Sequence, residues 1–227
     1  MAQGASEPPG YRLAIGDKNY SSWSLRPWLA MRAFGIPFDE IDVVLRSPNR
    51  RANILAQSPS GLVPVLKAGA LTIWDTLAIL EYLAEAHPEL PMWPGPRDAR
   101  AVARSVSAEM HAGFRPLREA MPMDFVSIAP AADVPQPVAD DIRRIVAIWR
   151  DCRCRFGAGG PFLFGAFSIA DAMYAPVASR FRTYVEDLAP YGDDGVAAAY
   201  VRTIFATPEI KAWAAGAQEQ LGRGDRA

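Results

Sequence analysis

Strand-like and helix-like patterns of hydrophobic positions alternate along the first ninety residues. Residues 11–15 (YRLAI) alternate closely enough for a strand, which has a side-chain period of two. Residues 76–86 instead repeat their apolar positions every three to four residues, as one face of a helix does. The same patterns predict the order strand, helix, strand, helix, strand, strand, helix over residues 11–15, 24–34, 38–45, 51–57, 63–66, 71–73 and 76–86.

A proline-rich stretch separates this region from one that is helical throughout. Residues 88–96 (PELPMWPGP) contain four prolines, so neither a helix nor a central strand is predicted there. The apolar positions beyond it predict helices alone, over residues 98–121, 138–156, 169–181, 196–206 and 209–221. We therefore expect an α/β plus all-α fold, with an α/β domain of residues 11–87, a linker of residues 88–97 and an all-helical domain of residues 98–221.

Charge and composition narrow the possible chemistry. The chain has 24 Lys and Arg against 25 Asp and Glu, so it lacks the excess of positive charge that binding to nucleic acid requires. No apolar run approaches the roughly 20 residues that span a bilayer, so no membrane association is expected. Two cysteines are too few for a disulfide framework and suit the reducing cytoplasm. No zinc-type Cys/His spacing and no glycine-rich nucleotide loop is present, which indicates chemistry without a metal or a nucleotide.

Hydroxyl groups gather where the first predicted helix begins, in the segment YSSWSLR of residues 20–26. A helix N-terminus has free N–H groups and a partial positive charge, which favour an anion. The pKa of a thiol falls in such a setting, so a thiolate is one possible anion. Ser21 and Ser22 either donate hydrogen bonds to that anion or only cap the helix.

Two further elements combine polar groups with turns. In GLVPVL, Pro64 stands at the start of a strand, which is unusual unless the strand is an edge or its backbone faces a ligand. A cis Val63–Pro64 bond would direct the N–H and C=O of Val63 into open space. Asp75 and Thr76 precede a helix, where either could cap it or the two could receive an ammonium and a carboxylate together.

Ser168 and Asp171 carry a different signal, because a hydroxyl residue followed three positions later by an acid is similar to a capping box. Asp stands here where Glu or Gln is usual. We expect Asp171 to support a buried helix start and to take no part in catalysis.

In their order and spacing these elements resemble the glutathione transferase family over residues 11–221. SSWSLR is similar to the SSC-x-x-R signature of the zeta class and of related bacterial serine-type enzymes. The resemblance implies a thioredoxin-like, glutathione-binding first domain and an all-helical second domain. It also implies a cytoplasmic homodimer that uses glutathione as co-substrate.

The resemblance assigns roles to individual residues. Ser21 matches the serine whose hydroxyl bonds the glutathione sulfur, which makes it the expected catalytic residue, and Ser22 matches a supporting donor. Val63 matches the residue whose backbone pairs with the cysteinyl amide, and Pro64 matches the cis proline. The γ-glutamyl end is expected at Asp75 and Thr76. The glycine carboxylate has three unranked candidate partners, Arg50, Arg51 and Asn53.

The electrophile pocket is expected between the SSW loop and the first long helix of the second domain. Its expected lining is Trp23, Met110, His111 and Phe114. Cys152 and Cys154 lie two positions apart in a helical stretch, where side chains do not face each other, so we interpret both as structural.

The expected activity is attack by glutathione on a small hydrophobic electrophile. Two alternatives stay open, a glutathione-dependent cis–trans isomerase of the maleylacetoacetate isomerase type and a glutathione-binding protein without significant turnover. The isomerase would need cationic pocket residues, for which Arg115 and Arg118 are available, but Trp23 replaces the Cys of the zeta signature. Leu62 replaces the usual Gln or Lys, which predicts weaker glutathione binding. The absence of Cys before position 152 argues against a thiol transferase.

Overall fold

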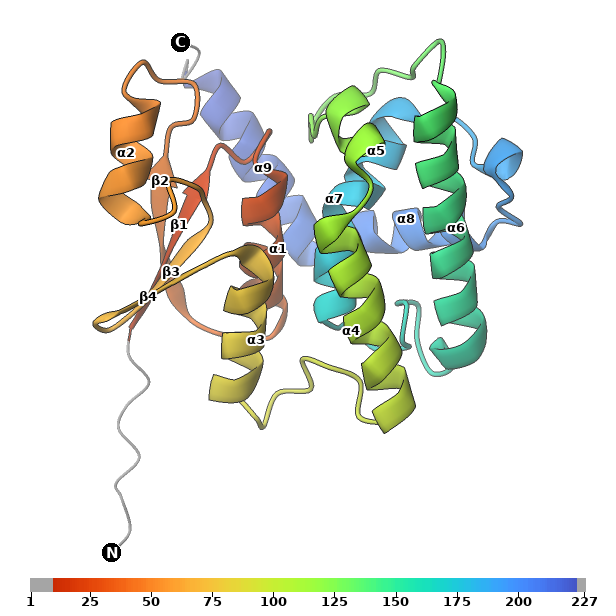
Figure 1. Ribbon diagram of the computed structural model, residues 1–227, viewed down its shortest axis with the longest axis horizontal. Coiled ribbons are helices and arrows are strands. Elements are labelled where there is room, and N and C mark those ends of the chain that lie inside the picture. Colours follow the sequence, from red (N-terminus) through yellow and green to blue (C-terminus); the bar gives the residue numbers. More distant parts are fainter. Residues whose placement is uncertain (1–9, 224–227) are drawn as a thin grey trace, which may run out of the picture.

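The computed structural model describes residues 10–223, which form an α/β part followed by a helical part (Figure 1). The α/β part contains strands β1 (Tyr11–Gly16), β2 (Phe38–Val43), β3 (Val65–Ala68) and β4 (Leu71–Trp74), with helices α1 (Ser22–Ala33), α2 (Arg50–Gln57) and α3 (Thr76–Ala86). The helical part contains α4 (Arg97–Ala112), α5 (Arg115–Ala120), α6 (Gln136–Phe156), α7 (Ile169–Tyr184), the 3-10 helix η1 (Ala189–Tyr191), α8 (Val196–Ala206) and α9 (Pro208–Gly222).

The strands form one mixed sheet in the order β2-β1-β3-β4. β1 runs parallel to β2, with Leu13 opposite Glu40, and antiparallel to β3, with Leu13 opposite Leu66. β4 returns antiparallel along β3 and forms one edge. This thioredoxin-like arrangement confirms the predicted fold class.

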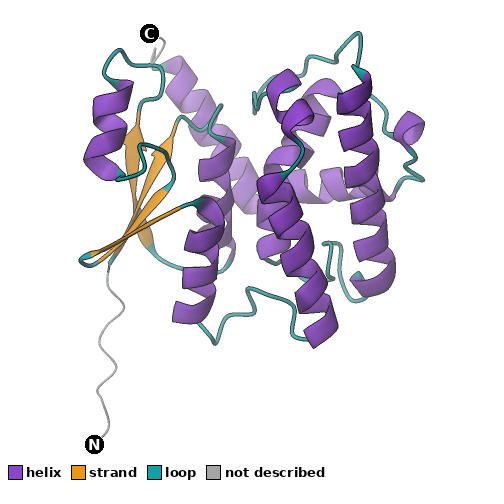
Figure 2. Cartoon of the chain, in the orientation of Figure 1, coloured by secondary structure: helices purple, strands orange, loops and turns teal. Residues whose placement is uncertain are grey.

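The two faces of the sheet are covered by different helices (Figure 2). Successive side chains of a strand point to opposite faces, and β1 follows this rule. Leu13 and Ile15 join the large core under α1 and α3, whereas Ala14 joins a smaller cluster with Ile54 of α2. Because both faces are covered, β1 lies in the interior, and its C-terminal end leads directly to the start of α1.

Helix α7 is the centre of the helical part and is buried over nearly its whole length. It packs against α1 of the α/β part as well as against α4 and α8. One continuous hydrophobic cluster therefore includes Leu29 of α1 and Met173 of α7. Within residues 10–223, no helix combines the length and the apolar character needed to cross a membrane.

One predicted helix is wrong as a single element. The stretch 98–121 forms two helices, α4 and α5, which are separated at Gly113 and Phe114. Phe114 has a left-handed backbone, with φ of 56°, which no continuous helix contains. A Cβ on Gly113 would lie 2.8 Å from the carbonyl oxygen of Glu109, so this tight exit favours glycine. The pattern did not reveal the break because the apolar positions continue in phase across it.

The ends of the other elements differ by smaller amounts. Helix α1 begins at Ser22, two positions before the predicted start, and β3 begins at Val65, two positions after it. The second change has a physical reason, since Pro64 cannot donate a hydrogen bond to a strand ladder. Of the described elements, η1 was not predicted at all.

The predicted capping box at the start of α7 is confirmed. The Oδ2 atom of Asp171 accepts hydrogen bonds from the backbone N–H and the hydroxyl of Ser168, at 2.9 and 3.0 Å. Its Oδ1 atom accepts from the N–H of Leu163 and the hydroxyl of Tyr200, both at 3.0 Å. The carboxylate is fully buried and joins the 163 loop and α8 to the start of α7.

We predict that Asp171→Asn lowers the free energy of unfolding by about 2–4 kcal/mol. Each oxygen of Asp171 accepts from two buried donors, whereas Asn has one oxygen and one NH2 group. In either orientation of Asn, its NH2 group therefore faces two buried donors and cannot accept from them. Urea unfolding followed by circular dichroism measures the loss. The matched control is Asp151→Asn, which removes an exposed pair with Arg155 and should cost under about 1 kcal/mol. Equal losses in the two variants would contradict a structural role for Asp171.

Candidate functional site

A cavity of about 530 Å³ opens where the two parts of the fold meet. Its walls come from the start of α1, the loop before β3, the turn between β4 and α3, and the last turn of α4. The lining residues are Trp23, Ser60, Leu62, Val63, Pro64, Trp74, Asp75, Thr76 and His111. Most of the residues singled out in the sequence thus gather at one place, although they come from four separate segments.

Ser21 and Ser22 lie at the start of α1, next to this cavity but outside its lining. Ser21 is the N-cap, and its hydroxyl donates to the hydroxyl of Ser24 at 2.7 Å. The Ser24 oxygen also accepts from the backbone N–H of Gly16, at 3.1 Å. The Ser22 oxygen accepts from a guanidinium N–H of Arg180, at 3.3 Å. Both serines are buried, with 7% and 9% of their surface exposed, so only a small part of each hydroxyl can meet a ligand.

Val63 and Pro64 form the wall opposite α1, and the peptide bond between them is cis. Val63 precedes the first ladder residue of β3. The backbone of Val63 therefore lies outside the paired residues of the sheet. Leu62 lies beside Val63 in the cavity lining, with 68% of its surface exposed.

Asp75 and Thr76 close the cavity at the start of α3. Asp75 is the N-cap with a positive φ of 70°, and its Oδ1 atom accepts from the N–H of Leu77 at 2.9 Å. The Thr76 hydroxyl donates to the carbonyl oxygen of Trp23 at 3.1 Å, which ties the start of α3 to the start of α1. The second oxygen of Asp75 meets His111 of α4 at 2.7 Å. The turn therefore presents a carboxylate that is already bonded on two sides.

Three arginine side chains crowd behind Trp23. The guanidinium carbon of Arg26 lies 4.2 Å from the centre of the indole ring, and that of Arg118 lies 5.4 Å from it. Arg26 donates to backbone carbonyls of Met173 and Ser22, and its buried Nη2 atom has no hydrogen-bond partner among residues 10–223. Burial lowers the pKa of Arg26, and the neighbouring Arg180 and Arg118 cations lower it further.

Arg180 has a similar environment on α7. It donates to the carbonyl oxygens of Met121 and Pro176 as well as to Ser22. Burial first, and then Arg118, lower the pKa of Arg180 to about 10, so it is still charged at neutral pH. Backbone carbonyls hold these two cations in place without neutralising them. The start of α1 therefore lies in a positive electrostatic field that favours an anion.

The expected lining of the electrophile pocket divides into two groups. Trp23 and His111 line the cavity and contact each other edge to face, with ring centres 5.4 Å apart. Met110 and Phe114 instead lie in the hydrophobic core, with 0% and 7% of their surface exposed. Met110 lies on the buried face of α4, seven positions after Ala103 and four after Val106, so it packs into the core instead of lining the cavity. The three candidates for the glycine carboxylate, Arg50, Arg51 and Asn53, are exposed on α2 and outside the lining.

The cysteines lie on α6, which contributes nothing to this lining. Both are free thiols, Cys152 buried and Cys154 exposed. Burial raises the pKa of the Cys152 thiol to about 12. Among the described residues no group of three or more His, Cys, Asp or Glu side chains could hold a metal ion.

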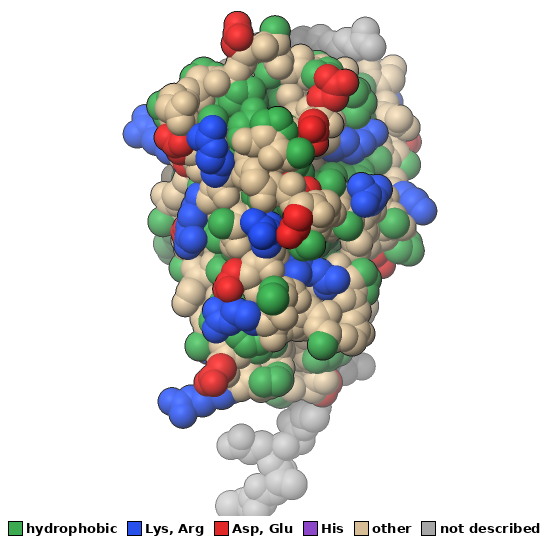
Figure 3. All heavy atoms as spheres, turned by 90° about the vertical axis from the view of Figure 1, so that its right-hand side faces the viewer, with side chains coloured by type: hydrophobic (Ala, Val, Ile, Leu, Met, Phe, Trp, Pro, Cys, Tyr) green, Lys and Arg blue, Asp and Glu red, His purple; other side chains and the backbone are tan. Residues whose placement is uncertain are grey.

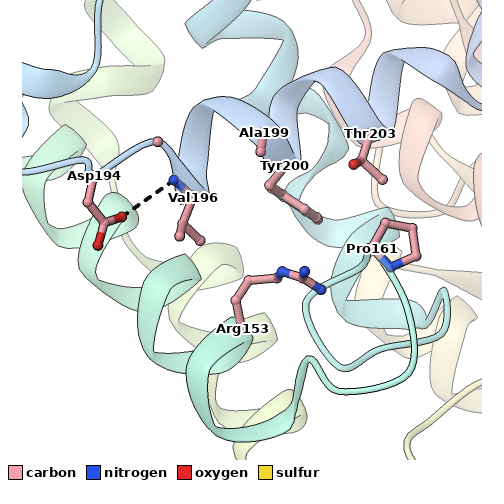
Figure 4. A pocket seen from close by; sticks show the side chains of 8 residues that line it. Arg153, Pro161, Asp194, Val196, Ala199, Tyr200 and Thr203 are labelled. Atoms are coloured by element: carbon pink, nitrogen blue, oxygen red, sulfur yellow. Dashed lines mark hydrogen bonds between the residues drawn. The ribbon is translucent and has the colours of Figure 1, made fainter.

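A second cavity, of about 560 Å³, lies between the end of α6, the loop that follows it and the start of α8. Figure 4 shows the Arg153 side chain turned toward the space between Pro161 and Tyr200. This guanidinium donates to the carbonyl oxygens of Gly160 and Phe162, both at 2.6 Å, and so fastens the loop. On the face of the helical part in Figure 3, acidic and basic side chains are interspersed instead of being sorted by sign.

Two features of the site escaped the sequence analysis. The first is Arg180. It is the one cation in the largely apolar helical stretch 169–181, and this could have drawn attention to it, because arginine is seldom fully buried unless it is paired. The second is the contact between His111 and Asp75, which joins residues 36 positions apart in the sequence. A contact over this sequence separation cannot be predicted from the local sequence pattern.

Comparisons with known proteins found relatives of this chain. Residues 20–86 match the family model of the glutathione S-transferase N-terminal domain. A probable maleylacetoacetate isomerase of Caenorhabditis elegans is 25% identical over 174 residues, covering 75% of this chain and 78% of the relative. A zeta-class glutathione S-transferase of Euphorbia esula is 29% identical over 118 residues, 51% of this chain and 52% of the relative.

Solved structures share the fold. A glutathione transferase homologue from Burkholderia, solved with bound glutathione, matches with a TM-score of 0.67 and 21% identity, over 92% of this chain and 98% of that one. A diazinon-metabolizing glutathione S-transferase of the silkworm Bombyx mori matches with a TM-score of 0.71 and 14% identity, over 93% and 98%. At these identities the likeness concerns the fold alone.

Proposed function

The chain belongs to the glutathione S-transferase family, and we propose that it is a glutathione transferase with glutathione as its co-substrate. In this proposal the enzyme activates the thiol of glutathione for attack on a small hydrophobic electrophile. The observation that supports it is the order of groups around one cavity, namely Trp23 at the start of α1, then Val63 and Pro64, then Asp75 and Thr76. A tripeptide with a central thiol and an ammonium and carboxylate at one end fits this order.

Each part of glutathione has a partner of matching chemistry. The backbone of Val63 can pair with the cysteinyl amide as an added strand does, since β3 has not yet begun there. The Asp75 carboxylate can accept from the γ-glutamyl ammonium, and the start of α3 with Thr76 can donate to the α-carboxylate. Bound in this direction, the sulfur lies toward Ser21 and Ser22.

The start of α1 then stabilises a thiolate. A free thiol has a pKa of about 8.5, so its nucleophilic form is a minority at neutral pH. A hydroxyl donor and a helix N-terminus together contribute about 2–3 kcal/mol, which corresponds to about two pKa units. The thiol proton passes to solvent, the sulfur forms a bond to the electrophilic carbon, and a leaving group departs with the bonding electrons.

The two serines enter this step differently. Ser21 must redirect its proton from Ser24 to the sulfur, an exchange of one hydrogen bond for a stronger charge-assisted one. Ser22 accepts from Arg180, which leaves its own proton available. We assign the catalytic contact to Ser21 and a supporting contact to Ser22.

We predict that Ser21→Ala raises the pKa of the bound glutathione thiol by about 1–2 units. The thiolate absorbs in the ultraviolet, so a pH titration of the difference spectrum of the glutathione complex measures this pKa directly. Ser22→Ala, measured in parallel, should give a smaller rise. Ser105→Ala is the matched control, because Ser105 is exposed on α4 and donates to the carbonyl oxygen of Ala101 on its own helix.

The outcomes separate three mechanisms. A larger rise in Ser22→Ala than in Ser21→Ala would transfer the catalytic contact to Ser22. An unchanged pKa in both variants would leave the helix N-terminus as the stabilising group. Binding of glutathione by the wild type with no lowering of the thiol pKa would refute the transferase and favour a glutathione-binding protein without turnover.

A second candidate function is cis–trans isomerisation of an unsaturated acid, of the maleylacetoacetate isomerase type. The observation that favours it is the group of Arg26, Arg118 and Arg180 behind Trp23, which suits an anionic electrophile. In that reaction the thiolate adds to the double bond, the resulting single bond rotates, and elimination returns the thiolate. No net change in atoms or electrons occurs, and glutathione is regenerated.

The charge of the electrophile distinguishes the two functions. We predict that Arg118→Met lowers kcat/KM about tenfold for an electrophile that bears a carboxylate, by removal of one charge-assisted hydrogen bond. The same variant should leave kcat/KM for a neutral aryl halide within about twofold. The matched control is Arg115→Met, because Arg115 is exposed on the same helix and pairs with Glu119. Parallel losses for both electrophiles would argue against the isomerase.

We further propose that the enzyme is a cytoplasmic homodimer. Its two unpaired thiols suit a reducing compartment. The resemblance to glutathione transferases supports the homodimer. Size-exclusion chromatography with light scattering should give twice the chain mass of 24.7 kDa, and a monomer would refute the dimer.

A further inference from the structure

His111 reaches across the cavity from the helical part to the carboxylate of the α/β part. Its Nε2 atom lies 2.9 Å from Oδ1 and 2.7 Å from Oδ2 of Asp75. The imidazole also packs edge to face on the indole of Trp23. His111 is partly buried, with 32% of its side chain exposed, so its ring is held on two sides.

The Asp75 carboxylate would otherwise have a loose torsion. Rotation about the bond between Cβ and the carboxyl carbon is broad and weakly restricted in aspartate. The backbone N–H of Leu77, on α3, donates a hydrogen bond to Oδ1, and the Nε2 atom of His111, on α4, lies within hydrogen-bond distance of both oxygens. Two donors from different directions fix the plane of the group, whereas one donor leaves it free to turn.

Fixing the plane leaves acceptor capacity in a defined direction. An ionised carboxylate has about four acceptor positions on its two oxygens. The two donors occupy part of this capacity, and 48% of the Asp75 side chain is still exposed where it lines the cavity. A cationic donor that enters the cavity therefore meets a preoriented acceptor.

We propose that His111 is a positioning residue that orients Asp75 for the γ-glutamyl ammonium of glutathione. This inference rests on the proposed function, because it concerns the same cavity. His111 acts through Asp75 and not on the sulfur, which the start of α1 receives. It therefore changes the binding of glutathione and leaves the thiol chemistry unaltered. Its role differs from the electrophile-pocket role that the sequence suggested.

The test compares two thiols that carry the γ-glutamyl group with one that lacks it. His111→Phe keeps a flat ring against Trp23 but has no donor for Asp75. The variant should raise KM about tenfold for glutathione and for γ-glutamylcysteine, because the Asp75 carboxylate then has to be ordered when the ammonium binds. It should leave kcat and the pKa of the bound thiol at their wild-type values. For cysteinylglycine, which lacks the γ-glutamyl group, KM should not change.

Two further variants serve as controls. His111→Gln retains an N–H donor and should recover most of the glutathione affinity. His87→Gln replaces the other histidine of the chain, which bonds Tyr11 at the far end of α3, and should change no kinetic constant. Thermal unfolding of all three variants shows whether each one is folded.

The results separate failure of the positioning role of His111 from failure of the proposed function. An unchanged KM for glutathione in His111→Phe, or an equal rise for cysteinylglycine, overturns the positioning role. A parallel fall in kcat for all three thiols would overturn it as well, because it would place His111 in the thiol chemistry. Failure of the proposed function is seen separately, as wild-type protein that neither binds nor turns over glutathione.

Discussion

A buried guanidinium fastens the two parts of this fold together at the site. Arg26 leaves α1 one turn after its start and donates both to the Ser22 carbonyl on its own helix and to the Met173 carbonyl on α7. Taking a cation out of water is costly, so the cost must be offset by these bonds and by the indole of Trp23. The position of α1 against α7 is thereby specified by polar geometry as well as by apolar packing. Displacing Arg26 would move the hydroxyls at the start of α1.

The cavity depends on the contact between the two parts of the fold, because its lining comes from both of them. The start of α1, the strand edge at Val63 and the turn at Asp75 belong to the α/β part, and only His111 comes from the helical part. The bond from Thr76 to the Trp23 carbonyl closes the arrangement on the α/β side. The α/β part thus supplies most of the cavity wall, and the helical part contributes His111 together with the cations Arg118 and Arg180 near Arg26.

The elements that were predicted well are those in which local chemistry decides the structure. The capping box at Ser168 and Asp171 and the helix over Thr76–Ala86 were read from adjacent residues, because caps and periodicity are local properties. The break after α4 was missed, because the left-handed backbone of Phe114 leaves no trace in an apolar pattern. In the site, the segments were recognisable one by one. Their mutual contacts, such as Arg180 on Ser22, arise from tertiary packing and cannot be read from sequence spacing.

The placement of the thiols has a consequence for self-modification. An enzyme that handles electrophiles exposes its own nucleophiles to alkylation, and a thiolate is the most reactive of these. Cys152 is buried and its pKa is raised to about 12, so at neutral pH it stays protonated and out of reach. Cys154 is exposed but lies on the same helix, which forms no part of the cavity wall. Under the proposed function, the cysteine thiols of the protein thus lie away from the cavity in which glutathione would be activated, and the hydroxyls of Ser21 and Ser22, far weaker nucleophiles, would lie next to its sulfur.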